Sequence, residues 1–111
     1  MSVSVRQQDG VTILDLKGKI TLGMGDIALR NAVQDAINNG STKIVINMHD
    51  VSTIDSSGVG ELVSAYTSAA NRGAKLRLAS LPAKITDVLT ITQLITVFDV
   101  DDSVDEAVRS F

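Results

Sequence analysis

Hydrophobic positions along the chain change their spacing repeatedly between about two and about 3.6 residues, the periods of strands and helices. Val3 and Val5 alternate with polar residues and predict a short strand, and Val11 to Lys17 predicts a second one. The turn signal Asp9-Gly10 separates them, and strands joined by so short a turn pair antiparallel. The chain therefore begins with a predicted β-hairpin.

Helical and strand patterns alternate over the rest of the chain. The run 44–48 is almost wholly apolar and predicts a strand covered on both faces, 75–79 alternates as a strand, and 96–98 is expected to form a short final strand. Four segments carry apolar residues at helical spacing: Leu29, Ala32, Val33, Ala36 and Ile37; Val59, Leu62, Val63, Tyr66 and Ala70; Ile85, Val88 and Leu89; Val104, Ala107, Val108 and Phe111.

The residues at the ends of these helical segments agree with their assignment. Asp26 can cap the first helix and Asn39-Gly40 can end it, Gly73 can close the second, and Pro82 and Ser103 suit the starts of the last two. The order β-β-α-β-α-β-α-β-α predicts an α/β fold with a mixed, mainly parallel sheet of about five strands and about four helices. No linker composition divides the chain, so we expect a single domain over residues 1–111.

Composition excludes several classes of function. The chain has 111 residues and no cysteine, which removes disulfides and thiolate metal sites and fits a reducing compartment. Its start lacks the pattern of a signal peptide and no apolar run is long enough to span a membrane, so we expect a cytoplasmic protein without membrane insertion. The net charge is −3, basic residues are scattered and aromatics make up 3%, so we expect no nucleic-acid partner.

The most informative stretch runs from Asp50 to Gly60, through an expected loop at 49–55 and into an amphipathic helix. A helix start offers unpaired N–H groups and a positive dipole end, so it tolerates a phosphate. Phosphorylation of a serine here would add about −1.5 to −2 charges and obstruct a partner that docks on a neutral hydroxyl. Gly58 and Gly60 would let a partner's backbone approach closely.

Helix capping is the alternative interpretation of the same residues. Aspartate and serine before a helix are caps more often than functional groups, and by spacing alone capping is the commoner outcome. On this interpretation Asp55 or Ser56 caps the helix and Ser57 starts it. Glu61 lies four residues after Ser57, so the ideal capping-box spacing is absent.

The segment Ile54-Asp-Ser-Ser-Gly-Val-Gly-Glu-Leu62 resembles the STAS family, the domain of anti-sigma factor antagonists and of sulfate transporter tails. The likeness extends over nearly the whole chain. Further matching segments are 16–20, 44–51, 73–78, 89–94, Phe98 and 103–107. The resemblance implies a STAS-type fold.

The resemblance also implies a bacterial partner-switching protein that regulates sigma-factor-dependent transcription and is not an enzyme. Ser56 would be phosphorylated by a serine kinase that is also an anti-sigma factor, and a serine phosphatase would restore it. The unphosphorylated form would bind the kinase and free the sigma factor. ATP belongs to the kinase, so this chain is expected to need no cofactor and no metal.

The resemblance further implies a surface for the kinase around Ser56. We expect it to comprise Asp55, Ser56, Ser57, Gly58, Val59, Gly60, Thr21 and Met24. Asp55 would orient the hydroxyl or contact the kinase. Thr21 departs from the acidic residue that family members often carry there, and the glycine-rich loop Leu22 to Asp26 is about one residue longer than usual. A plain connecting loop at residues 23–25 is the alternative interpretation. We expect a monomer, with a weak dimer as the alternative.

Two other functions remain open at this point. The first is a STAS adaptor subunit of a signalling or lipid-transport complex that works without phosphorylation. The second is an enzyme of the receiver or small-hydrolase type that uses Asp55. The absence of a second catalytic carboxylate, base or metal cluster in the sequence counts against the enzyme.

Overall fold

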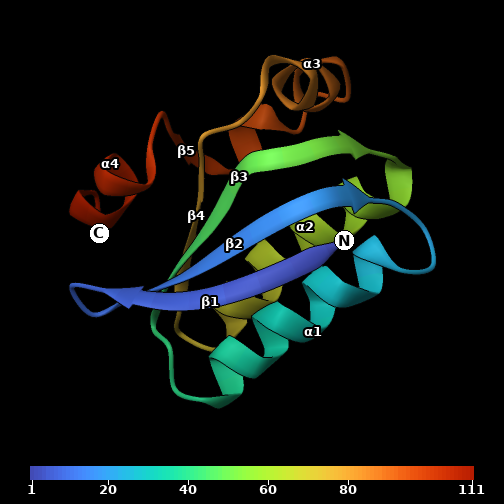
Figure 1. The fold of residues 1–111 in the computed structure, drawn as a ribbon. Coiled ribbons are helices and arrows are strands. Elements are labelled where there is room, and N and C mark those ends of the chain that lie inside the picture. Colours follow the sequence, from blue (N-terminus) through green and yellow to red (C-terminus); the bar gives the residue numbers. More distant parts are fainter.

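A five-stranded sheet in the order β1-β2-β3-β4-β5 forms the centre of the structure, a computed structural model that describes residues 1–111 (Figure 1). β1 pairs antiparallel with β2, and every other neighbouring pair is parallel. The strands are β1 Ser2–Gln8, β2 Val11–Ile20, β3 Lys43–Ile54, β4 Lys75–Ala79 and β5 Asp99–Asp101. The helices are α1 Gly25–Asn38, α2 Ser56–Asn71, α3 Ala83–Ile91 and α4 Val104–Arg109, with a 3-10 turn η1 at Ile95–Val97. This order confirms the predicted α/β fold and its mixed, mainly parallel sheet.

Helices cover the sheet unequally. α1 and α2 pack side by side beneath one face, α4 lies on the opposite face, and α3 packs against β3 (Figure 1). The larger core is almost wholly aliphatic and includes Leu14, Ile46 and Leu62, all without exposed surface. A second, smaller cluster lies under α4 and consists of Val11, Ile13, Val45, Ala79, Ala107 and Val108. Burial of each large aliphatic side chain contributes about 1.5–3 kcal/mol, so both clusters stabilise the sheet on which the helices rest.

β3 is longer than the pattern predicts. Residues 49–55 were expected to form a loop, but the strand continues to Ile54 because β2 also continues, to Ile20, and the two pair in parallel up to Ile20 and Ile54. In the second half of β3, residues 49, 50 and 52 are polar and exposed, and only Val51 and Ile54 are buried. The sequence there lacks the regular alternation of apolar and polar residues that indicates a strand. The expected loop is therefore wrong, and the helix that follows starts directly from the sheet.

The final strand lies later than predicted. Residues 95–97 form the 3-10 turn η1, Phe98 is buried in the larger core, and the strand is β5, Asp99–Asp101. The prediction of 96–98 is wrong: Thr96 and Val97 are exposed, Phe98 is buried as part of the connection, and none of the three pairs with β4. Parallel pairing of Arg77 with Asp99 and of Ala79 with Asp101 makes the acidic segment the strand.

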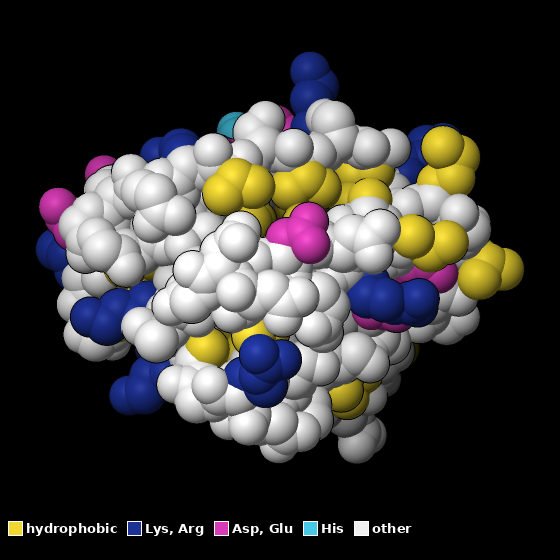
Figure 2. Space-filling model, turned by 90° about the horizontal axis from the view of Figure 1, so that it is seen from below, with side chains coloured by type: hydrophobic (Ala, Val, Ile, Leu, Met, Phe, Trp, Pro, Cys, Tyr) yellow, Lys and Arg dark blue, Asp and Glu magenta, His cyan; other side chains and the backbone are white.

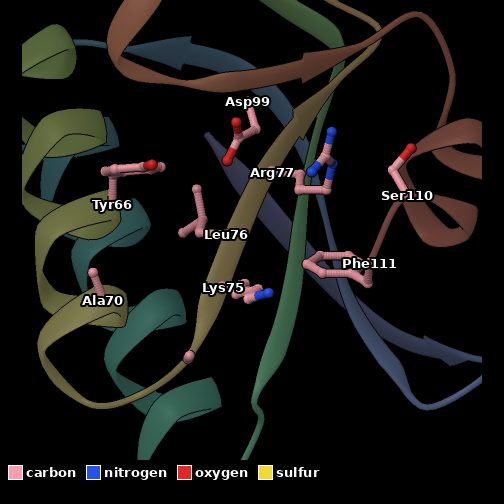
Figure 3. A pocket seen from close by; sticks show the side chains of 9 residues that line it. Tyr66, Ala70, Lys75, Leu76, Arg77, Asp99, Ser110 and Phe111 are labelled. Carbon is pink, nitrogen blue, oxygen red and sulfur yellow. The ribbon is translucent and has the colours of Figure 1, made fainter.

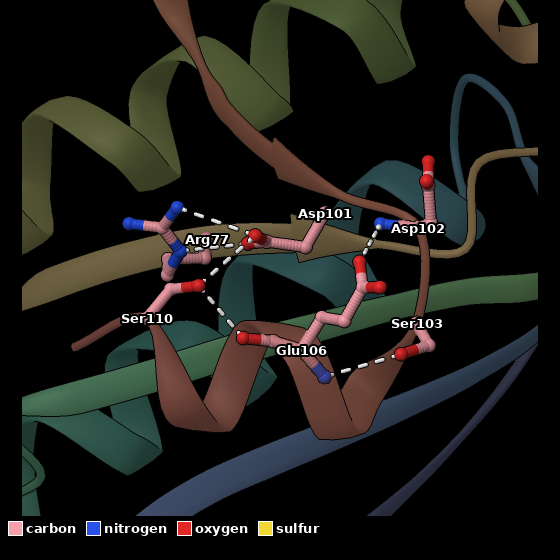
Figure 4. A network of polar contacts seen from close by, with 6 residues as sticks. All are labelled: Arg77, Asp101, Asp102, Ser103, Glu106 and Ser110. Atoms are coloured by element: carbon pink, nitrogen blue, oxygen red, sulfur yellow. Dashed lines mark hydrogen bonds and ion pairs between the residues drawn. The ribbon is translucent and has the colours of Figure 1, made fainter.

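A polar network fixes α4 to the sheet (Figure 4). Ser103 caps the helix as predicted, since its side chain accepts a hydrogen bond from the Glu106 N–H at 3.1 Å. Arg77 of β4 donates from Nε to Asp101 at 2.7 Å, and the Ser110 hydroxyl donates to Asp101 at 3.2 Å. The end of α4 is thereby tied to β4 and β5.

None of the helices is long and apolar enough to cross a membrane.

Candidate functional site

Ser56 is the first residue of α2 and is exposed, directly after the end of β3. Asp55 before it is the helix cap: its Oδ1 accepts a hydrogen bond from the Gly58 N–H at 2.9 Å. Of the two capping residues that the sequence left open, the structure selects Asp55. The cap therefore does not use the Ser56 hydroxyl, which lies on the surface at the positive end of a helix dipole. Ser57 is half-buried in the first turn.

Asp55 also anchors the neighbouring loop. Its second oxygen, Oδ2, accepts a hydrogen bond from the Leu22 N–H at 3.0 Å, so one carboxylate joins the start of α2 to the loop after β2. The N–H groups of Gly58 and then Leu22 lower the pKa of Asp55, because they stabilise its ionised form. The carboxylate is thus a fixed negative group beside Ser56.

The loop between β2 and α1, residues 21–24, is held from its other side by Asp26. Asp26 is buried and accepts hydrogen bonds from the Gly23 N–H at 3.0 Å and the Ile27 N–H at 2.8 Å. The prediction that Asp26 caps α1 is wrong, because the helix already begins at Gly25 and its start has no side-chain cap. Two carboxylates therefore accept hydrogen bonds from consecutive N–H groups of this loop: Asp55 from Leu22, and Asp26 from Gly23.

Large hydrophobic side chains protrude from the same loop. Leu22 is 75% exposed and Met24 is 77% exposed, values unusual for such residues. Figure 2 looks onto α1 and α2 and shows charged side chains scattered over this face, with hydrophobic side chains protruding at one end. The bond from Leu22 to Asp55 brings this loop beside Ser56, as expected for Thr21 and Met24. Leu22 was not among the predicted contact residues, although it lies in the glycine-rich loop that the sequence singled out.

The glycines after Ser57 serve different purposes. Gly58 is buried, and a Cβ on it would lie 2.1 Å from the Ile20 backbone oxygen. The missing side chain therefore allows α2 to pack directly against the end of β2. Val59 is also buried. Gly60 is exposed and has open space where a Cβ would be. Of these three predicted contact residues, only Gly60 offers surface to a partner.

Other hollows in the structure lie apart from these residues. A cavity of about 280 Å³ lies between the later part of α2, β4 and the chain end, and is lined by Tyr66, Arg77 and Phe111 among others (Figure 3). None of the predicted site residues lines it, and Arg77 is already paired with Asp101. A second hollow, of about 320 Å³, lies between α1 and α2 where Arg30 donates to Glu61 at 2.9 Å. The surface that unites the predicted residues is therefore the start of α2 with the loop 21–24.

The sheet starts with a hairpin and is otherwise parallel, and its longest strand leads directly into the helix that begins at Ser56; this arrangement is an α/β domain of the STAS type. The sequence profile of the STAS domain matches residues 2–107. This chain belongs to the STAS domain family.

Comparison with individual proteins agrees with this membership. A protein of Thermotoga maritima, provisionally named an anti-sigma factor antagonist, is 27% identical over 101 residues, which cover 91% of this chain and 89% of the relative. A crystal structure of a Thermotoga maritima protein with the same provisional name superposes with a TM-score of 0.88 at 27% identity, over 97% of this chain and 92% of that one.

More distant structures share the fold. The Bacillus cell fate determinant SpoIIAA, solved in its phosphorylated form, has a TM-score of 0.72 at 19% identity, with 98% of each chain covered. A sulfate transporter family protein from Wolinella succinogenes has a TM-score of 0.79 at 24% identity, over 93% of this chain and 85% of that one. At these identities the likeness concerns the arrangement of strands and helices.

Proposed function

We propose that this chain is an anti-sigma factor antagonist whose binding to an anti-sigma factor serine kinase is controlled by phosphorylation of Ser56. The unphosphorylated chain binds the kinase and releases the sigma factor. A serine phosphatase reverses the modification. The observation that carries the proposal is the exposed Ser56 at the start of α2, beside a cap that does not use its hydroxyl.

The surroundings of Ser56 support a docking role. Leu22 and Met24 give a partner apolar surface to bury, and the Asp55 carboxylate holds Leu22 in place next to the serine. Exposed large apolar residues that gather next to polar groups are typical of protein-interaction surfaces. The relatives from Thermotoga maritima, provisionally named anti-sigma factor antagonists, support the same class of partner.

A phosphate on Ser56 would act through charge. It would place about −1.5 to −2 charges beside ionised Asp55, while the helix start would offset part of the repulsion within the chain. The fold therefore tolerates the group. A kinase surface packed over Leu22 and Ser56 would have to desolvate that charge, and unfavourable charge placement at an interface costs several kcal/mol.

Phosphate transfer tests the proposal directly. The chain is incubated with its anti-sigma factor kinase and Mg-ATP, and intact mass with fragmentation locates the added group. We expect one phosphate on wild type and on Ser57→Ala, and none on Ser56→Ala. Because both serines lie in the first turn of α2, the Ser57→Ala variant is the matched control.

The same measurement separates the adaptor from the switch. A chain that binds the kinase but gains no phosphate under conditions where the kinase is active would work as a constitutive adaptor. A phosphate found on Ser57 alone would contradict the assignment of Ser56.

A further inference from the structure

The two edges of the sheet differ in how they are protected. β5 has three residues, two of them aspartate, and such short acidic edges discourage pairing with another strand. β1 has seven residues, no proline and no bulge, and its single charge, Arg6, is already paired with Asp15 at 2.7 Å. In Figure 1, β1 lies at the front edge of the sheet with α1 beneath it. β1 is therefore the edge that is open to another strand.

The hairpin geometry shows which backbone groups of β1 face outward. Asp9 and Gly10 both have positive φ, 53° and 80°, which is typical of a two-residue type I′ turn. Gln8 and Val11 flank that turn and form a hydrogen-bonded pair, so Ser2, Ser4, Arg6 and Gln8 direct their N–H and C=O groups toward β2. The groups of the intervening residues, Val3, Val5 and Gln7, consequently point away from the sheet.

We propose that β1 pairs antiparallel with β1 of a second copy of this chain, about a two-fold axis at Val5. In this register Val5 lies opposite the partner's Val5, and Val3 lies opposite the partner's Gln7. Every outward N–H and C=O of the three residues then has a partner, because both members of each opposed pair direct these groups outward. The edge is thus self-complementary.

The side chains permit this register. No like charges lie opposite one another, since Arg6 is opposite the partner's Ser4, and Val5, which is 61% exposed, covers the partner's Val5. The groove of about 390 Å³ between β1 and α1 runs along the same edge. Asp35 is the only charged residue that lines it, and the small side chains of Ala28 and Ala32 leave room for a second copy.

The contact area sets the strength of the dimer. Three paired residues on each strand bury far less than the roughly 800 Å² per partner of a standard interface, so we expect a weak dimer with a dissociation constant in the range of about 10 µM to about 1 mM. Ser56 follows β3, which is separated from β1 by β2. Dimer formation therefore leaves the start of α2 open and does not depend on the proposed switch.

Sedimentation equilibrium from about 10 µM to about 2 mM tests the proposal, because this range brackets the expected dissociation constant. We expect the wild-type mass to rise from one chain toward two, and Ser56→Glu to behave in the same way. Val5→Lys and Val5→Glu should each remain monomeric, because each places like charges across the axis. An equimolar mixture of the two variants should dimerise again, while Thr67→Lys, which adds a charge on the exposed face of α2, should dimerise like wild type.

Restored dimerisation of the mixture distinguishes this register from a general effect of charge or of misfolding. As a second measurement, the backbone amide signals of Val3, Val5 and Gln7 should shift with concentration, while those of Ser4 and Arg6 stay unchanged. A wild-type chain that is monomeric over the whole range contradicts the proposal. So does a dimer that survives in Val5→Lys alone, or a mixture that fails to dimerise.

Discussion

The starts of α1 and α2 rest against the same strand end but are built differently. A Cβ on Gly25 would lie 2.0 Å from the Lys19 backbone oxygen, and one on Gly58 would lie 2.1 Å from that of Ile20. α2 begins with the Asp55 cap, whereas α1 has no side-chain cap. Close backbone contact therefore fixes the position of both helix starts, and capping is an addition at only one of them.

The difference between the two starts determines what each displays. The start of α2 presents the exposed hydroxyl of Ser56, the proposed phosphoacceptor. The start of α1 is preceded by two exposed hydrophobic side chains, Leu22 and Met24. Asp55 connects the two through its bonds to Gly58 and Leu22. The proposed phosphoacceptor and two exposed apolar side chains thus lie next to one another at the end of the sheet.

The largest expected effect on stability comes from adding a side chain at Gly25 or Gly58, where each helix start contacts the end of β2. We expect Gly58→Ala and Gly25→Ala each to lower the free energy of unfolding by about 2 kcal/mol or more, because the added methyl meets a backbone oxygen that cannot move aside. Urea denaturation measures the change.

Gly60 supplies the matched control for that prediction. Its Cβ position is open, so Gly60→Ala should raise stability by up to about 1 kcal/mol through helix propensity. If Gly58→Ala were as stable as Gly60→Ala, close contact with β2 would not be what fixes the start of α2.

The apolar surface is the next feature to remove. Replacing Leu22 and Met24 together with serine should weaken kinase binding at least tenfold, equivalent to about 1.4 kcal/mol, because buried apolar contact is lost. Stability should change little, since both side chains are exposed. Isothermal titration calorimetry gives the affinity. Ile91→Ser in α3, where the isoleucine is 80% exposed, should bind as wild type, and equal losses in both variants would argue against a specific patch.

The smallest effect concerns the charge of Asp55. Its pKa is lower in the folded chain than the value of about 3.9 in an unfolded one, so it contributes stability above that pH, and the contribution disappears as the pH falls through the folded pKa. The stability difference between wild type and Asp55→Ala should therefore be present at about pH 7 and smaller at about pH 2.5. Denaturation at both pH values measures it, and a difference independent of pH would contradict the role of the carboxylate.

Much of the fold could be predicted because its signals are local. The Asp9-Gly10 turn, the apolar strand at 44–48 and the Ser103 cap each depend on a few adjacent residues. The extension of β3 to Ile54 and the placement of β5 could not be predicted, because both depend on pairing with distant strands. Where polar residues alternate with buried ones only over part of a strand, the partner strand decides its length.

The candidate site is marked in the sequence at its centre and less so in its surroundings. Asp55 and Ser56 follow from the motif, and the two capping interpretations were separated only by the geometry of the Gly58 N–H. The inward position of Gly58 against β2 and the hydrogen bond from Leu22 to Asp55 depend on contacts between residues far apart in the sequence. Such contacts leave no periodic pattern in a single sequence.

Kinase affinity as a function of charge on Ser56 is the most direct test of the account. The measurement compares wild type, Ser56→Ala, Ser56→Glu and the chain phosphorylated on Ser56, with Ser57→Ala as the neighbouring control. We expect wild type, Ser56→Ala and Ser57→Ala to bind alike, and the two negatively charged forms to bind at least tenfold more weakly, a difference of about 1.4 kcal/mol. Equal affinity of the unmodified and the phosphorylated chain would contradict the proposal that a negative group at the start of α2 decides docking.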